Sequence, residues 1–207
     1  MSIVPGGAVT GTLGCAEFDA AAVAAAAEVA SAGVPDTRVF HHDLGDIEVY
    51  VEPHRLAARA LIVSATEVAR ALRLHLRQLG YEVVVLESRR ERVTPADEPA
   101  VAGIGELDLG RFDVAVLTDH DAPDVTEALA ALLASPVRFV GVMGSRRHVG
   151  HYVETLRAQG VTDEQLARIR SPLGLDIGGR EPEQIALSIA AGIVADVNDK
   201  PGGWLDR

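Results

Sequence analysis

The sequence FVGVMGSRRHVG (139–150) predicts a buried strand over Val137–Val142 that ends in a glycine turn and passes directly into a helix. RSPLGLDIGG (170–179) predicts a loop whose glycines allow backbone conformations and close approaches that a side chain would forbid. EPEQIALSIAAGIVA (181–195) predicts a second helix, because Pro182 suits a first helical turn. Apolar residues recur along one face of that helix, namely Ile185, Ile189, Ile193 and Val197.

Strands and helices alternate from Ala58 up to this stretch. The expected strands are 60–63, 82–86 and 112–117, and the expected helices are 68–78 and 125–133. A basic and irregular segment, Ser88–Leu109, separates the second strand from the third. The alternation predicts an α/β fold with a Rossmann-like, doubly wound parallel sheet.

The first part of the chain has a different pattern. We expect a strand over Gly6–Leu13, an alanine-rich helix over Glu17–Ala32, and a hairpin of strands Thr37–His42 and Ile47–Val51. The sequence therefore predicts a small N-terminal α+β domain at 1–56, a Rossmann-like domain at 57–198 and a C-terminal tail at 199–207.

Composition restricts the class of partner. The formal net charge of −11 argues against nucleic acid and anionic membranes as main partners, since phosphate binding needs clustered Lys and Arg. The longest apolar run, Ala20–Ala27, is far shorter than the ~20 residues of a membrane span. A single cysteine, Cys15, excludes an intrachain disulfide and favours a reduced, cytoplasmic location.

Several of these motifs resemble one family. GVMGSRR, PLGLDIG and EQIALSIAA are similar to the Rossmann-type domain of the XdhC/CoxI proteins, accessory factors of molybdenum hydroxylases such as xanthine dehydrogenase and CO dehydrogenase. TGTLGCAEFDAAAV (10–23) resembles the glycine and cysteine motif of that family's N-terminal domain, and DIEVYVEPHR and LTDHDAPD resemble two further segments. Members usually carry more strands before the cysteine motif, so we expect either a short subfamily or a minimal N-terminal domain.

The resemblance implies a cofactor contact at the cysteine motif. In the family this cysteine is a candidate contact for the molybdenum cofactor, a molybdopterin, so Cys15 is the expected metal and sulfur ligand, with Gly14 and Glu17 beside it. A thiol at a helix N-terminus has its thiolate form favoured by the helix dipole. The alternative for Cys15 is a small buried packing residue.

A second expected site lies after the strand that ends at Val142. Gly144 and Ser145 begin a helix whose free N–H groups, with Arg146 and Arg147, would bind an anion such as the cofactor phosphate. Asp176 is expected to close the same crevice from the opposite side. The alternative for the two arginines is a solvated helix start.

A third expected site is the turn after the first strand of the Rossmann-like domain. Ser64 and Thr66 stand where dinucleotide-binding turns carry glycine, and Glu67 adds a negative charge, so NAD(P) is disfavoured. Glu87 holds the position of a ribose-binding acid, although a surface acid is equally compatible. His120 follows the third strand and is a candidate proton carrier or ligand contact, with an exposed loop as the alternative.

The other histidines carry no closed metal set. His148 and His151 are one turn apart, and His41, His42 and Asp43 lie together at a strand end, so we expect no structural metal there.

We therefore expect a cytoplasmic carrier that holds the molybdenum cofactor for a hydroxylase apoenzyme rather than an enzyme, and a homodimer is compatible with that role. An NAD(P)-dependent oxidoreductase is one alternative. Another is a scaffold that binds no cofactor and docks a hydroxylase subunit or a cysteine desulfurase.

Overall fold

The chain forms two compact units in the computed structural model, Met1–Leu56 and Ala57–Arg207. The structure describes residues 1–4, 6–43, 45–54, 57–144 and 146–205, and for 146–149 it describes the backbone only.

The second unit contains a six-stranded, fully parallel sheet. Its strands lie in the order β10-β9-β8-β5-β6-β7, so the chain reverses direction across the sheet between β5 and β8. In open α/β sheets ligands bind at the carboxyl ends of the strands near such a reversal. The strands are β5 Arg59–Val63, β6 Glu82–Leu86, β7 Ala100–Val101, β8 Val114–Leu117, β9 Phe139–Val142 and β10 Ile169–Arg170.

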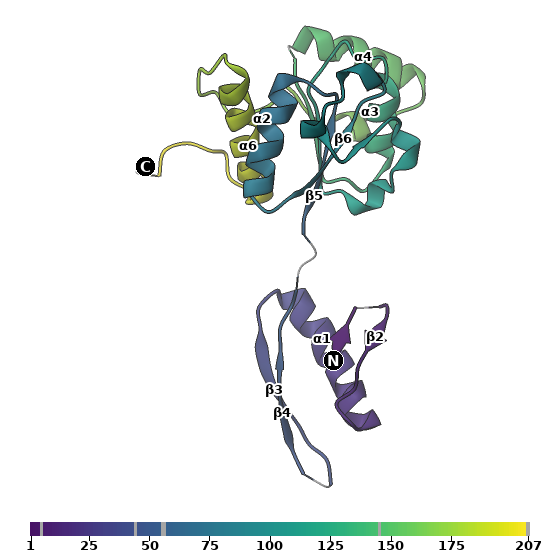
Figure 1. Cartoon of the computed structure of the whole chain (residues 1–207), viewed down its shortest axis with the longest axis vertical. Coiled ribbons are helices and arrows are strands. Elements are labelled where there is room, and N and C mark those ends of the chain that lie inside the picture. The colour runs from purple at the N-terminus through teal and green to yellow at the C-terminus, as the bar shows by residue number, and fades with distance from the viewer. Residues whose placement is uncertain (5, 44, 55–56, 145, 206–207) are drawn as a thin grey trace. The chain divides into compact units, whose positions relative to one another are not determined.

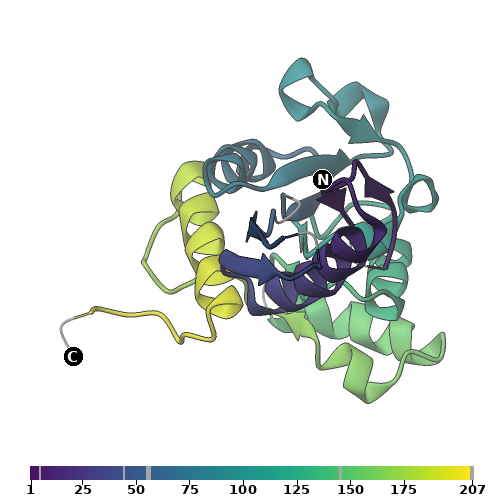
Figure 2. The ribbon, with the colours of Figure 1, turned by 90° about the horizontal axis from the view of Figure 1, so that it is seen from below.

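Helices cover both faces of this sheet (Figure 1). On one face α2 and α6 lie side by side, as both views show (Figure 2), and on the other lie α3 and α4. The α/β, Rossmann-like prediction is therefore confirmed. The helices are α2 Glu67–Gln78, α3 Val125–Ala134, α4 Arg146–Ala158, α5 Asp163–Leu166 and α6 Pro182–Val197, with short 3-10 turns at Arg90–Arg92, Pro95–Asp97, Ile104–Glu106 and Leu109–Arg111.

The sequence of β5 shows why the sheet is covered on both faces. Ala60 and Ile62 pack in the cluster with α2 and α6, whereas Leu61 and Val63 pack in the cluster with α3 and α4. Because successive side chains of a strand point to opposite faces, a continuous apolar run requires an apolar layer on each side.

Pro182 is the first residue of α6, as predicted, and Ile189 and Ile193 are fully buried. Val197 was expected on the same buried face, but it is 39% exposed because it is the last residue of the helix. Gly174, in the loop before α6, has a φ of +94°, and a Cβ there would lie 2.4 Å from Ser188 Oγ. The loop therefore needs glycine at this point, as predicted.

The first unit combines one helix with two small antiparallel pairs (Figure 1). The expected hairpin is confirmed, with Asp36 paired to Val51 and Phe40 to Ile47. The strand expected over Gly6–Leu13 was wrong in extent, since only Val9–Thr10 is a strand and the left-handed Gly6 and Gly11 interrupt the extended backbone. The elements are β1 Ser2–Ile3, β2 Val9–Thr10, α1 Ala16–Ala32, β3 Asp36–Phe40 and β4 Ile47–Val51.

The core of the first unit is thin. Among its described residues, the buried side chains are Ala22, Ala25 and Val29, all from α1. Small alanine side chains let the hairpin approach the helix closely but bury little apolar surface. Over the described parts of both units, no helix has the length and apolar content needed to cross a membrane.

Candidate functional site

The loop before α1 is fastened to the helix by one carboxylate. Asp19 accepts hydrogen bonds from the Leu13 N–H at 2.6 Å and from the Thr12 hydroxyl at 2.7 Å. The Leu13 N–H, and then the Thr12 hydroxyl, lower the pKa of Asp19. This arrangement fixes the turn at Gly14, whose φ is +92°, and thereby the position of Cys15 at the start of the helix.

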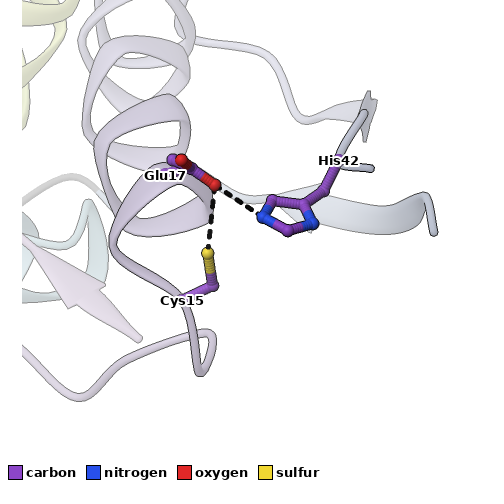
Figure 3. A group of neighbouring side chains, drawn as sticks. All are labelled: Cys15, Glu17 and His42. Atoms are coloured by element: carbon purple, nitrogen blue, oxygen red, sulfur yellow. Dashed lines mark hydrogen bonds and ion pairs between the residues drawn. The ribbon is translucent and has the colours of Figure 1, made fainter. Parts of the chain in front are cut away.

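Cys15 belongs to a group of three neighbouring side chains whose types can bind a metal ion (Figure 3). Its Sγ lies 3.6 Å from Glu17 Oε2, and the same oxygen lies 2.6 Å from His42 Nε2. One ligand atom from each residue lies within 4.8 Å of the other two. Glu17 extends from the first turn of α1, and His42 lies two residues beyond the end of the hairpin strand β3.

Cys15 and His42 border an open pocket of about 510 Å³ within the first unit. Its lining includes Gly14, Cys15, Phe18, His42, Gly45, Asp46 and Ile47. The ring of Phe18 lies 5.5 Å from that of His42, so one wall of the pocket is aromatic. The His42 side chain is 23% exposed and that of Glu17 is 72% exposed, so both polar groups are accessible to solvent.

In the second unit, Glu87 lies at the carboxyl end of β6 and its side chain is 1% exposed. Its Oε2 accepts from the Ala65 N–H at 3.0 Å and from Arg89 Nη2 at 2.9 Å. Its Oε1 accepts from Arg89 Nε at 2.7 Å and from the Arg89 N–H at 3.1 Å. An ionised carboxylate has about four acceptor positions, and these four donors occupy them.

The network continues from Arg89 to the next strand end. Arg89 Nη2 also donates to Asp119 at 2.9 Å, and Arg92 donates to the same oxygen at 2.8 Å. Burial, the largest contribution, raises the pKa values of Glu87 and Asp119, but the donated hydrogen bonds outweigh it and leave both below their usual range. The pKa of Arg89 is raised, and its hydrogen bond to Glu87 is the largest of several contributions.

Ser64 and Thr66, in the turn after β5, stand where dinucleotide-binding turns carry glycine, and one of the two has a left-handed backbone conformation. Ser64 has a φ of +82°, a conformation that non-glycine residues rarely adopt. Thr66 has a φ of −108° and caps α2, accepting from the Ala69 N–H at 3.0 Å. Thr66 also donates to the Thr118 hydroxyl at 3.1 Å, so its side chain occupies the helix start that a pyrophosphate would need.

Glu67, the first residue of α2, is the residue whose negative charge was expected to disfavour a pyrophosphate. Its side chain is 73% exposed and pairs with Arg70 at 2.5 Å. Arg70 also holds the buried carboxylate of Asp97 at 3.1 Å.

His120 lies in the loop after β8, beside the network. Its Nε2 is 3.5 Å from Asp121, and its carbonyl oxygen accepts a hydrogen bond from the Tyr152 hydroxyl. Asp119, His120 and Asp121 form a second group of ligand atoms within 4.8 Å of one another. Because Asp119 already accepts from two arginines, their positive charges disfavour a cation at this group.

The expected anion site is described only in part. Gly144 has a φ of +142° at the turn after β9, and α4 begins at Arg146. Ser145 and the side chains of Arg146 and Arg147 lie outside the described residues. Asp176 is exposed, in the loop that leaves the carboxyl end of β10.

The structure thus groups Ser64, Thr66, Glu87 and His120 at the carboxyl ends of three neighbouring strands, while Cys15, Gly14 and Glu17 belong to the first unit. Sequence reasoning missed the contribution of His42 to the cysteine site. Along β3 and beyond, the half-buried side chains are those of 38, 40 and 42. In the strand expected over Thr37–His42, Phe40 and His42 are two residues apart and share a face, and this spacing is the sequence signal that could have placed His42 on the same side as Phe40.

The fold and its sites define a Rossmann-type domain attached to a small unit with a pocket that contains a cysteine. Residues 60–193 match the XdhC Rossmann domain family, and the chain therefore belongs to that family. The predicted XdhC resemblance is confirmed.

Two relatives indicate the breadth of the similarity. The chain is 32% identical over 171 residues to the uncharacterized protein YqeB of Escherichia coli (strain K12), a match that spans 78% of this chain and 31% of YqeB. A structure described as a xanthine dehydrogenase from Bacillus halodurans aligns with a TM-score of 0.59 and 17% identity, over 89% of this chain and 66% of that chain. At that identity the likeness shows the fold alone.

Proposed function

We propose that this protein is an accessory factor in the maturation of a molybdenum hydroxylase and holds the molybdenum cofactor for transfer to the apoenzyme. One observation carries the proposal: in a chain of the XdhC family, the thiol of Cys15 lines a pocket at the start of α1. The carrier role follows from the family resemblance of the cysteine motif. A hydroxylase apoenzyme is the partner that this role requires.

The described residues are compatible with such a cofactor. Cys15 offers a soft sulfur donor, and Gly14 leaves space beside it because a glycine has no side chain. The cofactor would supply the molybdenum that the hydroxylase needs for its chemistry. The chain would hold the metal end through Cys15. Separately, the sequence motif at Arg146 and Arg147 is expected to bind an anion such as a phosphate group.

The geometry supports a carrier over an NAD(P)-dependent oxidoreductase. The Thr66 side chain caps the helix that would receive the pyrophosphate, and four donors fill the acceptor positions of Glu87 that would bind a ribose. The helix start and the carboxylate that a dinucleotide would need are thus both already hydrogen-bonded within the protein.

The test is purification of the full chain from a molybdenum-replete host, followed by molybdenum and pterin analysis. We expect both in wild-type protein and a marked loss in Cys15→Ser, a nearly isosteric change. Replacing Arg146 and Arg147 with alanine should weaken cofactor binding by roughly 2–4 kcal/mol if the contacts are charge-assisted. Equal molybdenum and pterin content in wild type and Cys15→Ser would refute the role of Cys15.

A further inference from the structure

We propose that, when the molybdenum cofactor is not bound to the Cys15 thiol, Cys15, Glu17 and His42 form a binding site for a thiophilic divalent cation of the Zn²⁺ type. Thiolate, imidazole and carboxylate are the three donor types that Zn²⁺ binds in proteins. The two harder divalent cations, Mg²⁺ and Ca²⁺, prefer oxygen ligands and would not use the sulfur.

The distances fit tetrahedral coordination with a small rearrangement. Zn–S and Zn–O bonds of about 2.3 and 2.1 Å at a tetrahedral angle place the two ligand atoms about 3.6 Å apart. Cys15 Sγ and Glu17 Oε2 are 3.6 Å apart. His42 Nε2 and Glu17 Oε2, at 2.6 Å, would have to separate by about 0.8 Å to reach the spacing of zinc ligands.

The surroundings allow this rearrangement. The Glu17 side chain is 72% exposed, so its carboxylate can rotate without repacking the core. The sulfur is fixed from the backbone side by the loop that Asp19 holds. The rearrangement therefore requires little more than motion of one exposed side chain.

Charge balance favours a divalent ion at this point. A thiolate, a carboxylate and a neutral imidazole carry two negative charges, which one divalent cation neutralises. Three protein ligands leave a fourth coordination position, as in zinc sites that bind a water or a small ligand, and two of the ligands, Cys15 and His42, line the pocket of about 510 Å³. The site would thus bind an exchangeable ligand.

The experiment is a titration of chelator-treated full-length protein with Co²⁺, whose thiolate complex absorbs in the near ultraviolet, followed by displacement with Zn²⁺. We expect one equivalent of Co²⁺ and a thiolate band. Cys15→Ser should abolish the band, and His42→Gln and Glu17→Gln should weaken binding roughly tenfold or more. The matched control is His41→Gln, because His41 neighbours His42 but pairs with Asp46 and is 77% exposed.

A second measurement uses only the wild-type chain and is therefore insensitive to misfolded variants. Zn²⁺, but not Mg²⁺, should slow the alkylation of Cys15 by iodoacetamide. Absence of a thiolate band, equal affinity in wild type and His42→Gln, or unchanged alkylation with Zn²⁺ would each overturn the proposal. Pterin analysis of the same preparation tests the proposed function separately, since a chain that binds Zn²⁺ but never carries pterin refutes only the latter.

Discussion

Replacement of Glu87 by glutamine should destabilise the second unit by about 3 kcal/mol. All four groups that contact this carboxylate are donors, so a glutamine amide must turn its NH₂ toward at least one of them. Hydrogen bonds to a charged group contribute about 1.5–3 kcal/mol each, and losing one or two of them sets the magnitude. The Arg89 side chain is 24% exposed and keeps Asp119, which limits the cost of the unpaired cation.

Urea denaturation at neutral pH, followed by circular dichroism, measures this change in the free energy of unfolding. Glu67→Gln is the matched control, because it also removes a carboxylate that pairs with arginine but is 73% exposed. Exposed ion pairs contribute about 0–1 kcal/mol, so the control should differ little from wild type. If Glu87→Gln unfolds at the same urea concentration as the control, the network does not stabilise the strand ends.

Three further outcomes are expected. The pKa values of Glu87 and Asp119 are lowered in the folded state. The stabilisation of the fold by these two carboxylates is therefore complete above their unfolded pKa values and is lost as the pH falls below about 4.5. The urea midpoint should decrease in acid, and less steeply in Glu87→Gln. Ser64→Gly should stabilise the fold by up to about 1 kcal/mol, since glycine relieves the left-handed strain at the expense of unfolded-chain entropy, whereas Ser64→Ala keeps the strain and should not stabilise. Calorimetry should show only weak NAD or NADP binding, because Thr66 caps α2, and low-micromolar affinity for either would contradict this.

The central strands could be predicted because they are buried on both faces. Ala60–Val63 and Val83–Leu86 are continuous apolar runs, and such runs between helical patterns identify a parallel sheet. The edge strands Ala100–Val101 and Ile169–Arg170 were not predicted. A strand of two residues has no periodicity, and its existence depends on the neighbour that supplies its hydrogen bonds.

The site at the carboxyl ends of the strands shows a different limit. Glu87 and Arg89 are close in sequence, but Asp119 is 30 residues from Arg89 and meets it only because the sheet brings the ends of β6 and β8 to the same edge. The sequence shows that Glu87, Arg89 and Asp119 follow strands, but it does not indicate that Arg89 donates hydrogen bonds to both carboxylates. Strand order, which no local pattern encodes, determines these contacts.

The strand-end network and the Cys15 group differ in how fully their polar groups are already hydrogen-bonded within the protein, and this bears on where a ligand would bind. At the strand ends, the acceptors of Glu87 are filled and Asp119 accepts from two arginines, so a ligand there would have to displace strong charge-assisted hydrogen bonds. In the first unit, a ligand of Cys15 would replace a long contact of 3.6 Å to the exposed Glu17 carboxylate, whereas a ligand that also used Glu17 would have to displace its 2.6 Å contact to His42. Ligand binding at Cys15 should therefore require less reorganisation than binding at Glu87. Cys15→Ser should affect ligand binding without lowering the free energy of unfolding, and Glu87→Gln should show the opposite pattern.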